Sequence, residues 1–462
     1  MFSTERKYAN RIDFLSCDMP GYFIDYIPVD GATKLVFTFE NADQPSRPRP
    51  DGLREPWGGM WLHNRGYAVV GVKPKSVEWY RGQDLHEFFR SNYLQSLVSQ
   101  FDQVFLYGSS MGGFAAMTFA DAIPGATVIA LNPQSTLAPH LVPWETRYQE
   151  GQSQDWSGDF ADARIGASKA RSVFVAYDPL FELDRKHIAR LDQANLIPFK
   201  MPLVGHVIGM YMSEIGVLSA FVEGALAGTL TAQECNILAR NRRKTPRYFY
   251  CLGKSSRSIA VKEACLRKIA KFQKITPDYQ RNFMDLLVSS GAWYLLGDSE
   301  FQKDLIGFED EFLFTVLKLA ADNSYLEHAL EVSQLAITRR KVSPAMLVLI
   351  AECLWKLKRL QEAEAYGRLA VHSAPGYGNA YRILARILFS DKRATEARDV
   401  ARVGVGVEGT SFLGWCDLAR YNEAAGDVAG ALMAAGLAAK LQPDNTVPKA
   451  VIERLRLHVT EK

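Results

Sequence analysis

The chain has 462 residues, and 48% of them are hydrophobic, which is enough apolar surface for about two to four domains with sizeable cores. Lys and Arg number 54 against 51 Asp and Glu, so the formal net charge is only +3. Proteins that bind nucleic acid concentrate positive charge on one face. We therefore expect no nucleic-acid partner.

The termini and the cysteines bear on location and on metals. The first ten residues are polar and charged, which predicts no signal peptide, and no long apolar run predicts a membrane span. The six cysteines lack the paired spacing of a zinc site, which favours reduced structural thiols: Cys17, Cys235, Cys251, Cys265, Cys353 and Cys416. We expect a cytoplasmic protein without a metal or another cofactor.

The first half of the chain alternates strand-like and helix-like segments. Short β-branched and aromatic runs predict strands over 34–39, 67–72, 104–107, 127–131, 172–177 and 196–203. Helical patterns lie between several of them, over 84–99, 114–120 and 188–194. This alternation predicts an α/β fold with a mostly parallel, doubly wound sheet, which we place at residues 1–225.

One motif in this domain suggests chemistry. Residues 107–113, YGSSMGG, contain the pattern G-x-S-x-G with Ser110 at its centre. Roughly one chain of this length in ten contains the pattern by chance, but here it lies between a predicted strand and a predicted helix. A nucleophile elbow requires this context. Ser110 is therefore the candidate nucleophile, and the alternative is an ordinary turn serine.

A serine nucleophile needs a base and a carboxylate that orients the base, in the chain order Ser, acid, His. Asp178 follows the predicted strand 172–177, and His206 follows the predicted strand 196–203. Open α/β sheets keep their sites at these strand ends. The sequence therefore predicts Ser110, Asp178 and His206 as the catalytic group.

Alternatives remain for the acid and for the base. Asp178 precedes Pro179, as a helix N-cap would, and in that case Asp184 or Glu182 is the acid. His187 lies on a predicted helix and is not favoured as the base. Three other histidines are weaker candidates for the base: His63, His86 and His140.

An oxyanion intermediate needs backbone donors. The N–H of Met111 starts a predicted helix, where it can stabilise an oxyanion. The second donor is expected in the loop after strand 34–39, at Asn41 or Ala42. On the same face, the loop 73–82 offers substrate contacts through Lys75, Trp79 and Tyr80, although Trp79 could equally pack against the sheet edge.

Pocket depth depends on segments 45–62 and 135–170, which we interpret as loops and caps. Pro45, Pro48 and Pro50 mark the first of them as a long loop. The strongest cap candidate is 140–162. Its Trp144 and Trp156 either line the pocket or plug it.

Beyond about residue 225, strand signals become sparse and helical patterns dominate. We interpret 226–309 as a helical linker region and 310–462 as helical repeats. The stretch 237–262 is basic, either as a solvated boundary or as a surface for an anionic partner.

The repeats have a period of 34, in the copies 344–377, 378–411 and 412–445. Positions 8 and 20 are alanine in every copy: Ala351, Ala363, Ala385, Ala397, Ala419 and Ala431. The pattern resembles the tetratricopeptide repeat, in which small residues there let two helices cross closely. A weaker copy covers 310–343, and 446–459 is a candidate capping helix. The repeats are a candidate surface for a protein partner.

Residues from about 20 to 225 resemble the α/β-hydrolase superfamily through YGSSMGGF, Asp178 and His206. The motif, with a later strand ending in Asn-Pro-Gln at 132–134, also resembles bacterial esterase- or acyltransferase-like proteins associated with surface glycans. The resemblance implies acyl transfer through an acyl-serine, with His206 as base and acid, Asp178 orienting it and Met111 as one oxyanion donor.

Three functions follow as hypotheses. The first is a serine hydrolase of the carboxylic-ester type, acting on a small-molecule or glycan ester. The second is an acyltransferase that uses the same triad and a glycan or protein acceptor. The third is a catalytically inactive hydrolase fold whose repeats serve as a protein-binding scaffold.

Overall fold

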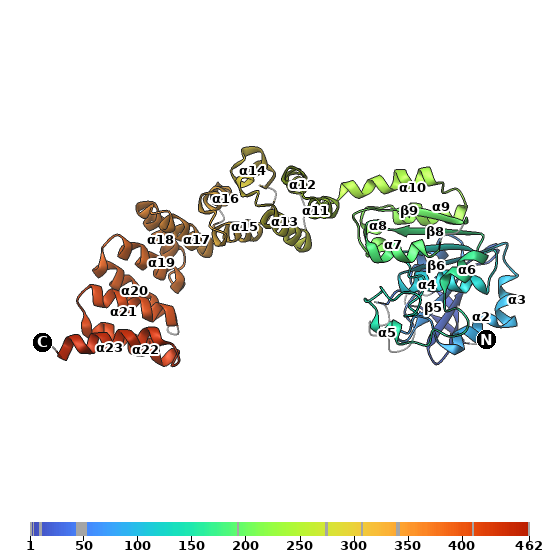
Figure 1. The fold of residues 1–462 in the computed structure, drawn as a ribbon, viewed down its shortest axis with the longest axis horizontal. Helices are drawn as coiled ribbons and strands as arrows, with labels where there is room; N and C mark the ends of the chain where they lie inside the picture. The colour runs from blue at the N-terminus through green and yellow to red at the C-terminus, as the bar shows by residue number, and fades with distance from the viewer. Residues whose placement is uncertain are drawn as a thin grey trace. The chain divides into compact units, whose positions relative to one another are not determined.

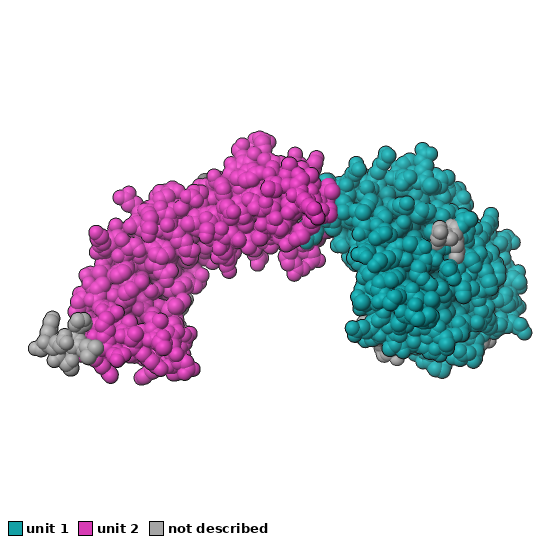
Figure 2. Space-filling model, in the orientation of Figure 1, with its two compact units in different colours: residues 1–251 teal, residues 252–462 magenta. Residues whose placement is uncertain are grey.

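The computed structural model describes the chain except residues 1, 3, 9–11, 43–52, 192–193, 273–275, 306–307, 339–341, 409–410 and 461–462, and the side chains of 408 and 457–460. The chain divides into two compact units, residues 1–251 and 252–462 (Figure 2). In the described residues the first unit contains all the strands, and the second consists of helices and their connections.

The first unit is built on a nine-stranded sheet (Figure 1). Across the sheet the strands are β1 (Thr4–Lys7), β2 (Asp13–Asp18), β3 (Tyr22–Ile27), β5 (Ala68–Pro74), β4 (Lys34–Phe39), β6 (Gln103–Ser109), β7 (Thr127–Leu131), β8 (Ser172–Tyr177) and β9 (Leu196–Lys200). From β5 to β9 neighbouring strands are parallel, whereas β1, β2 and β3 are antiparallel to their neighbours. The sheet is therefore mixed and only partly parallel, whereas the sequence predicts a mostly parallel one.

The prediction of the individual strands is confirmed for β4 to β9, with small shifts at their ends. The three antiparallel strands were missed. β1 is four residues long with mostly polar side chains, so it carries little apolar signal. β2 does alternate between buried and exposed positions, and this period of two would have identified it.

Apolar side chains cover both faces of the sheet. One face packs against α2 (Gln83–Arg90), α3 (Asn92–Val98), α4 (Met111–Thr118) and α6 (Ala163–Lys169). The other packs against α1 (Gly59–His63), α8 (Ile208–Glu214), α9 (Leu218–Ala227) and α10 (Ala232–Ala239). Because successive side chains of a strand point to opposite faces, Val36 and Phe37 of β4 join different clusters.

Two predicted helices differ from the structure. The predicted helix 84–99 is divided between α2 and α3 at Ser91, whose hydroxyl accepts a hydrogen bond from Leu94 N–H at 3.2 Å and so caps α3. The helix predicted at 188–194 lies earlier, as α7 (Glu182–Ala189). This shift places two ionisable side chains of α7 at the site described below.

The first unit ends at Cys251, later than the predicted boundary at residue 225. Leu230 and Cys235 bury their side chains in the second apolar cluster. The Tyr211 hydroxyl donates to the Arg242 carbonyl at 2.8 Å, and the Arg247 guanidinium donates to the carbonyl of residue 204 at 2.9 Å. Residues 226–251 therefore pack with the sheet, and part of the basic stretch satisfies carbonyls within this unit.

The second unit begins with α12 (Ile259–Ala270), α13 (Pro277–Ser290) and α14 (Ser299–Leu305), after α11 (Pro246–Ser255), which crosses the boundary. Three helix pairs confirm the predicted register: α17 (Pro344–Lys356) with α18 (Leu360–Ser373), α19 (Gly378–Ser390) with α20 (Ala394–Glu408), and α21 (Phe412–Ala424) with α22 (Val428–Leu441). The alanines at positions 8 and 20 are buried in every copy. The weaker copy corresponds to α15 (Asp310–Asp322) and α16 (Leu326–Thr338), and the capping helix to α23 (Thr446–Thr460).

Within the described ranges, no single helix is long and apolar enough to cross a membrane. The helices α8 and α9 meet the length and composition criteria only as a pair, bent by 105°.

Candidate active site

Ser110 occupies the turn between β6 and α4 in a strained backbone conformation. Its φ is 52° and its ψ is −118°, values that non-glycine residues rarely adopt. Close approaches surround the turn. A Cβ atom on Gly108 would lie 2.1 Å from the carbonyl oxygen of Gly112, and a Cβ atom on Gly112 would lie 2.2 Å from that of Phe39. Only glycine fits at both positions, so the G-x-S-x-G pattern follows from packing.

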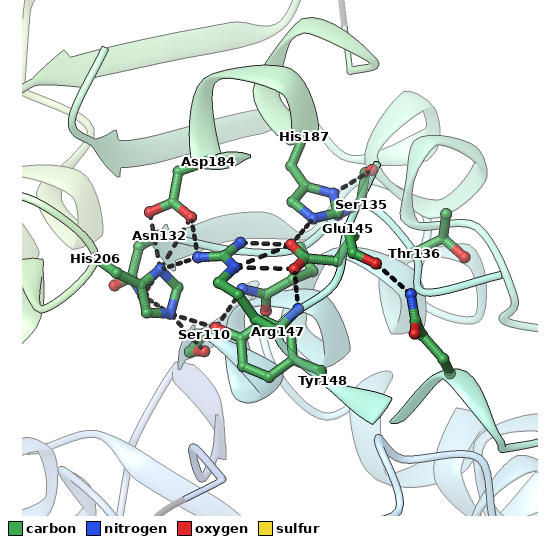
Figure 3. Close-up of polar contacts among 12 residues, drawn as sticks. Ser110, Asn132, Ser135, Thr136, Glu145, Arg147, Tyr148, Asp184, His187 and His206 are labelled. Carbon is green, nitrogen blue, oxygen red and sulfur yellow. Dashed lines mark hydrogen bonds and ion pairs between the residues drawn. The ribbon is translucent and has the colours of Figure 1, made fainter. Parts of the chain in front are cut away.

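His206 reaches Ser110 from the loop that follows β9 (Figure 3). Its Nε2 lies 3.1 Å from Ser110 Oγ. The preceding Gly205 has a φ of 75°, in the left-handed region that favours glycine. The structure thus brings the predicted nucleophile and the predicted base together. The alternative base His86 instead contacts the Tyr80 carbonyl at 3.0 Å.

The carboxylate beside His206 belongs to Asp184 on α7, and not to Asp178. The two Asp184 oxygens lie 2.8 and 2.9 Å from His206 Nδ1, and the side chain is fully buried. When Nδ1–H donates to Asp184, Nε2 carries no proton and can accept one from Ser110. The other alternative acid, Glu182, pairs with Lys186 at 2.7 Å and is exposed.

Asp178 holds the loop that carries the histidine. Its Oδ2 accepts the backbone N–H groups of Val204 at 2.8 Å and of Gly205 at 2.7 Å. Its Oδ1 accepts the N–H of Leu180 at 2.8 Å. The predicted pairing of Asp178 with His206 is therefore corrected, because backbone N–H groups occupy this carboxylate and Asp184 occupies Nδ1.

The predicted oxyanion donors lie on neighbouring backbone. A Cβ atom on Gly112 would lie within 2.8 Å of the carbonyl oxygens of both Phe39 and Glu40, so residues 39–40, which directly precede Asn41, run against the start of α4. In the described part of the chain, no hydrogen bond uses the backbone N–H of Met111, Asn41 or Ala42. These N–H groups remain candidates for the oxyanion site.

Two of the three predicted substrate contacts are buried, and the third forms an ion pair. Trp79 is 1% exposed and Tyr80 is fully buried. Trp79 packs its ring 4.9 Å from that of Tyr148, and the Tyr80 hydroxyl donates to the Glu40 carbonyl at 2.8 Å. Trp79 therefore packs against a residue that contacts His206, and Tyr80 is bonded to the segment that follows β4. Lys75 pairs with Asp18 at 2.6 Å beside the antiparallel strands.

Two residues beside the imidazole were missed. The Tyr148 hydroxyl lies 2.8 Å from His206 Nε2, and Asn132 Nδ2 lies 3.1 Å from the same atom. Asn132 has a φ of 38°, a second strained residue at the site. Asn132 lies at the end of β7, in the Asn-Pro-Gln segment that the resemblance had marked, and this was the signal available in the sequence.

A buried ionic network supports the acid (Figure 3). Arg147 Nη1 donates to Asp184 Oδ1 at 2.9 Å, and its Nη2 donates to Glu145 Oε2 at 2.6 Å. His187 Nε2 lies 3.0 Å from the same Glu145 oxygen. The Ser135 N–H donates to His187 Nδ1 at 3.1 Å, so Nε2 carries the proton and the imidazole is neutral.

The pKa directions agree with this hydrogen bonding. Burial lowers the pKa of His187. Burial alone would raise the pKa of Glu145, but hydrogen bonds from His187 and Arg147 lower it to about 2. Because Asp184 and His187 are three residues apart on one helix, a helical-face argument from the sequence would have placed both together.

The cap tryptophans differ in role. Trp156 is 9% exposed, donates to the Gly151 carbonyl at 2.8 Å and packs on Phe114, so it plugs the core. Trp144 packs against His187 with 4.6 Å between ring centroids. Of the other predicted pocket segment, 45–62, residues 45–52 fall outside the described residues, including Pro45, Pro48 and Pro50.

Other features lie apart from Ser110. A cavity of about 540 Å³ opens at the amino-terminal ends of β6, β7 and β8, the opposite edge of the sheet from the serine. The six cysteines are free. Among the side chains that the structure describes, no group of three or more His, Cys, Asp or Glu could hold a metal ion.

No protein-family model and no curated protein matches the chain. Similar solved structures are helical-repeat proteins, each at low similarity. MamA from Desulfovibrio magneticus has 18% identity and a TM-score of 0.29, covering 38% of this chain and 94% of its own. YrrB, described as a TPR protein with an unusual peptide-binding site, has 13% identity and a TM-score of 0.31, covering 44% of this chain and 100% of its own. A thermophilic TPR protein of Thermus thermophilus has 14% identity and a TM-score of 0.31, covering 39% of this chain and 92% of its own. The helical-repeat region of this chain resembles tetratricopeptide repeats, and its own 34-residue period and paired helices carry that description.

Proposed function

We propose that residues 1–251 form a serine hydrolase of the carboxylic-ester type that acts through an acyl-serine. One observation carries the proposal: His206 contacts Ser110 Oγ through Nε2 and Asp184 through Nδ1. Nucleophile, base and orienting carboxylate in hydrogen-bond reach are the requirement for an activated serine. The strained turn between β6 and α4 supports the finer assignment to the α/β-hydrolase superfamily.

The geometry supports the following steps. His206 Nε2 takes the Ser110 proton as Oγ attacks the ester carbonyl. The N–H of Met111, with that of Asn41 or Ala42, stabilises the oxyanion. Asp184 stabilises the imidazolium, which then gives its proton to the leaving alcohol oxygen. Water repeats the sequence on the acyl-serine and releases the acid.

The scaffold hypothesis requires a triad whose members lie too far apart to react. The distances of 3.1 and 2.8 Å on either side of His206 weigh against it. The acyltransferase hypothesis shares every step up to the acyl-serine, and the contact between Tyr148 and His206 favours it as the second candidate.

Labelling with a fluorophosphonate probe tests the proposal, because the probe reacts only with an activated serine. We expect the wild-type protein to be labelled and Ser110→Ala to lose the label completely. Ser109→Ala is the matched control, since Ser109 precedes the nucleophile and its hydroxyl contacts Asn132 at 3.4 Å instead of His206. Absence of labelling in the folded wild-type protein would refute the proposal.

A further inference from the structure

The base of the proposed triad has more hydrogen-bond donors around it than it can accept. His206 Nε2 lies 2.8 Å from the Tyr148 hydroxyl, and 3.1 Å from both Ser110 Oγ and Asn132 Nδ2. With Nδ1–H donating to Asp184, Nε2 has one in-plane lone pair and accepts one well-aligned hydrogen bond. The Tyr148 hydroxyl is the nearest of these three donors, so it competes with Ser110 for the base.

Tyr148 is held in this position by its own contacts. Its ring lies 4.9 Å from the ring of buried Trp79, and the Arg147 guanidinium lies 4.9 Å from its centroid. The buried Gln134 amide reaches the hydroxyl at 3.5 Å. Burial raises the pKa of Tyr148 to about 12, so the phenol keeps its proton near neutral pH and can donate it.

The hydroxyl of Tyr148 lies where the second substrate must react. The oxygen that attacks an acyl-serine has to contact the base and lie beside the Ser110 ester. Tyr148 meets the first condition directly, because its hydroxyl lies 2.8 Å from His206 Nε2, and it meets the second because Ser110 Oγ lies 3.1 Å from the same nitrogen. A water molecule must displace this hydroxyl without contributing other contacts, whereas a larger acceptor can offset the displacement with its own binding energy.

Exposed apolar side chains belong to the two segments that flank the base, 180–181 and 207–210. Leu180 is 64% exposed, Val207 is 39% exposed and Met210 is 67% exposed. Val207 follows His206 directly, and Leu180 precedes Phe181, whose ring lies 6.2 Å from the imidazole. An acceptor with an apolar body would cover these side chains.

We propose that Tyr148 is a specificity-determining residue that keeps water from His206 and directs the acyl group to an alcohol with an apolar body. The inference rests on the acyl-serine function proposed above. In the step, the alcohol oxygen bonds to the acyl carbon and its proton passes to His206 Nε2. The bond from that carbon to Ser110 Oγ then breaks, Oγ takes the proton, and the products are a new ester and the free enzyme.

The test uses p-nitrophenyl acetate with the full chain, with and without 1-butanol. We expect a burst of p-nitrophenol from acylation, then slow turnover that 1-butanol accelerates with formation of butyl acetate. Tyr148→Phe keeps the ring but removes the competing hydroxyl, so hydrolytic turnover should rise about two- to tenfold, as expected for the loss of one net hydrogen bond. The ratio of butyl acetate to acetate should fall by a similar factor.

Tyr211→Phe is the matched control. It also removes a buried phenol, one that donates to the Arg242 carbonyl at 2.8 Å, and it leaves His206 untouched. Its partition between water and 1-butanol should equal that of the wild type. The inference is overturned if Tyr148→Phe leaves the partition unchanged or slows both phases, or if 1-butanol has no effect. A burst that persists in Ser110→Ala would instead refute the acyl-serine function.

Discussion

Two aspartates near His206 have different roles because they face different partners. Asp184 lies against the imidazole Nδ1 and the Arg147 guanidinium. Asp178 is 3% exposed and accepts three backbone N–H groups. Both carboxylates follow β8 in the chain, so their positions in the sequence do not separate them. The direction in which each side chain points separates them.

Substitution of the two aspartates by asparagine should separate these roles. Asp184→Asn should lower the fluorophosphonate labelling rate by a factor on the order of 10³ to 10⁴, because an amide favours the wrong imidazole tautomer. Asp178→Asn should mainly destabilise the fold, by about 1–3 kcal/mol, because the amide replaces one of the two accepting oxygens by a donor and leaves a backbone N–H without an acceptor. Labelling kinetics and thermal unfolding measure the two effects. Equal loss of labelling in the two folded variants would contradict the assignment.

The network around Glu145 predicts how stability depends on pH. The pKa of Glu145 falls from its ordinary 4.5 to about 2, so its contribution is complete above pH 4.5 and is lost as pH falls toward 2. Burial lowers the pKa of His187 from its ordinary 6.5. The unfolded chain then binds that proton first, so stability also declines below pH 6.5.

Thermal unfolding between about pH 7 and pH 3 should therefore show the melting temperature falling with pH. Glu145→Gln should be less stable at pH 7, because Arg147 loses one of its two charged partners, and its melting temperature should fall less steeply below pH 4.5. Parallel pH curves for the variant and the wild type would show that Glu145 does not contribute in this way.

At the scale of elements, glycine positions show where packing controls the local structure. Gly108 and Gly112 are required because backbone of the same turn and of the end of β4 occupies the space of their Cβ atoms. In the repeats, position 27 is Ala370, Gly404 and Ala438. A Cβ atom on Gly404 would lie 2.8 Å from Tyr381 Cβ. The presence of Tyr381 on α19 therefore explains why this copy has glycine and not alanine at position 27 on α20.

Two glycine substitutions in the repeats should have opposite effects. Gly404→Ala should destabilise the helical unit by about 1–3 kcal/mol, because Tyr381 leaves no room for a methyl group. Gly436→Ala lies within α22, where a Cβ atom would meet nothing within 4 Å. It should stabilise the unit by about 0.5–1 kcal/mol through helix propensity. Denaturant unfolding of the helical unit would reveal the sign of each change.

At the scale of the whole molecule, the chain consists of a sheet unit and a helical-repeat unit with their own cores. Every residue of the proposed triad and of its supporting network lies before Cys251. Leu230, Cys235 and Ala239, which follow the predicted boundary at residue 225, are buried in the sheet unit.

The fragment 1–251 should fold alone and keep the fluorophosphonate reactivity of Ser110. The fragment 1–225 should be unstable, because it exposes the apolar surface that α10 covers. Circular dichroism and labelling of the two fragments test this difference. Comparable folding of both would place the boundary nearer to residue 225.

Short-range sequence patterns predicted many of the strands, the helix pairs of the repeats and the turn at Ser110. Strand-length apolar runs predicted β4 to β9, the 34-residue period predicted the helix pairs in register, and the glycines at 108 and 112 predicted the turn at Ser110. These signals lie within a few residues of what they specify, because propensity, periodicity and steric exclusion act locally. The contacts that define the site act between residues far apart in the chain. The packing of α7 at the strand ends places Asp184, and not Asp178, beside His206. The packing of segment 144–148 brings Tyr148 and Arg147 to the same imidazole. No local sequence pattern predicts either arrangement.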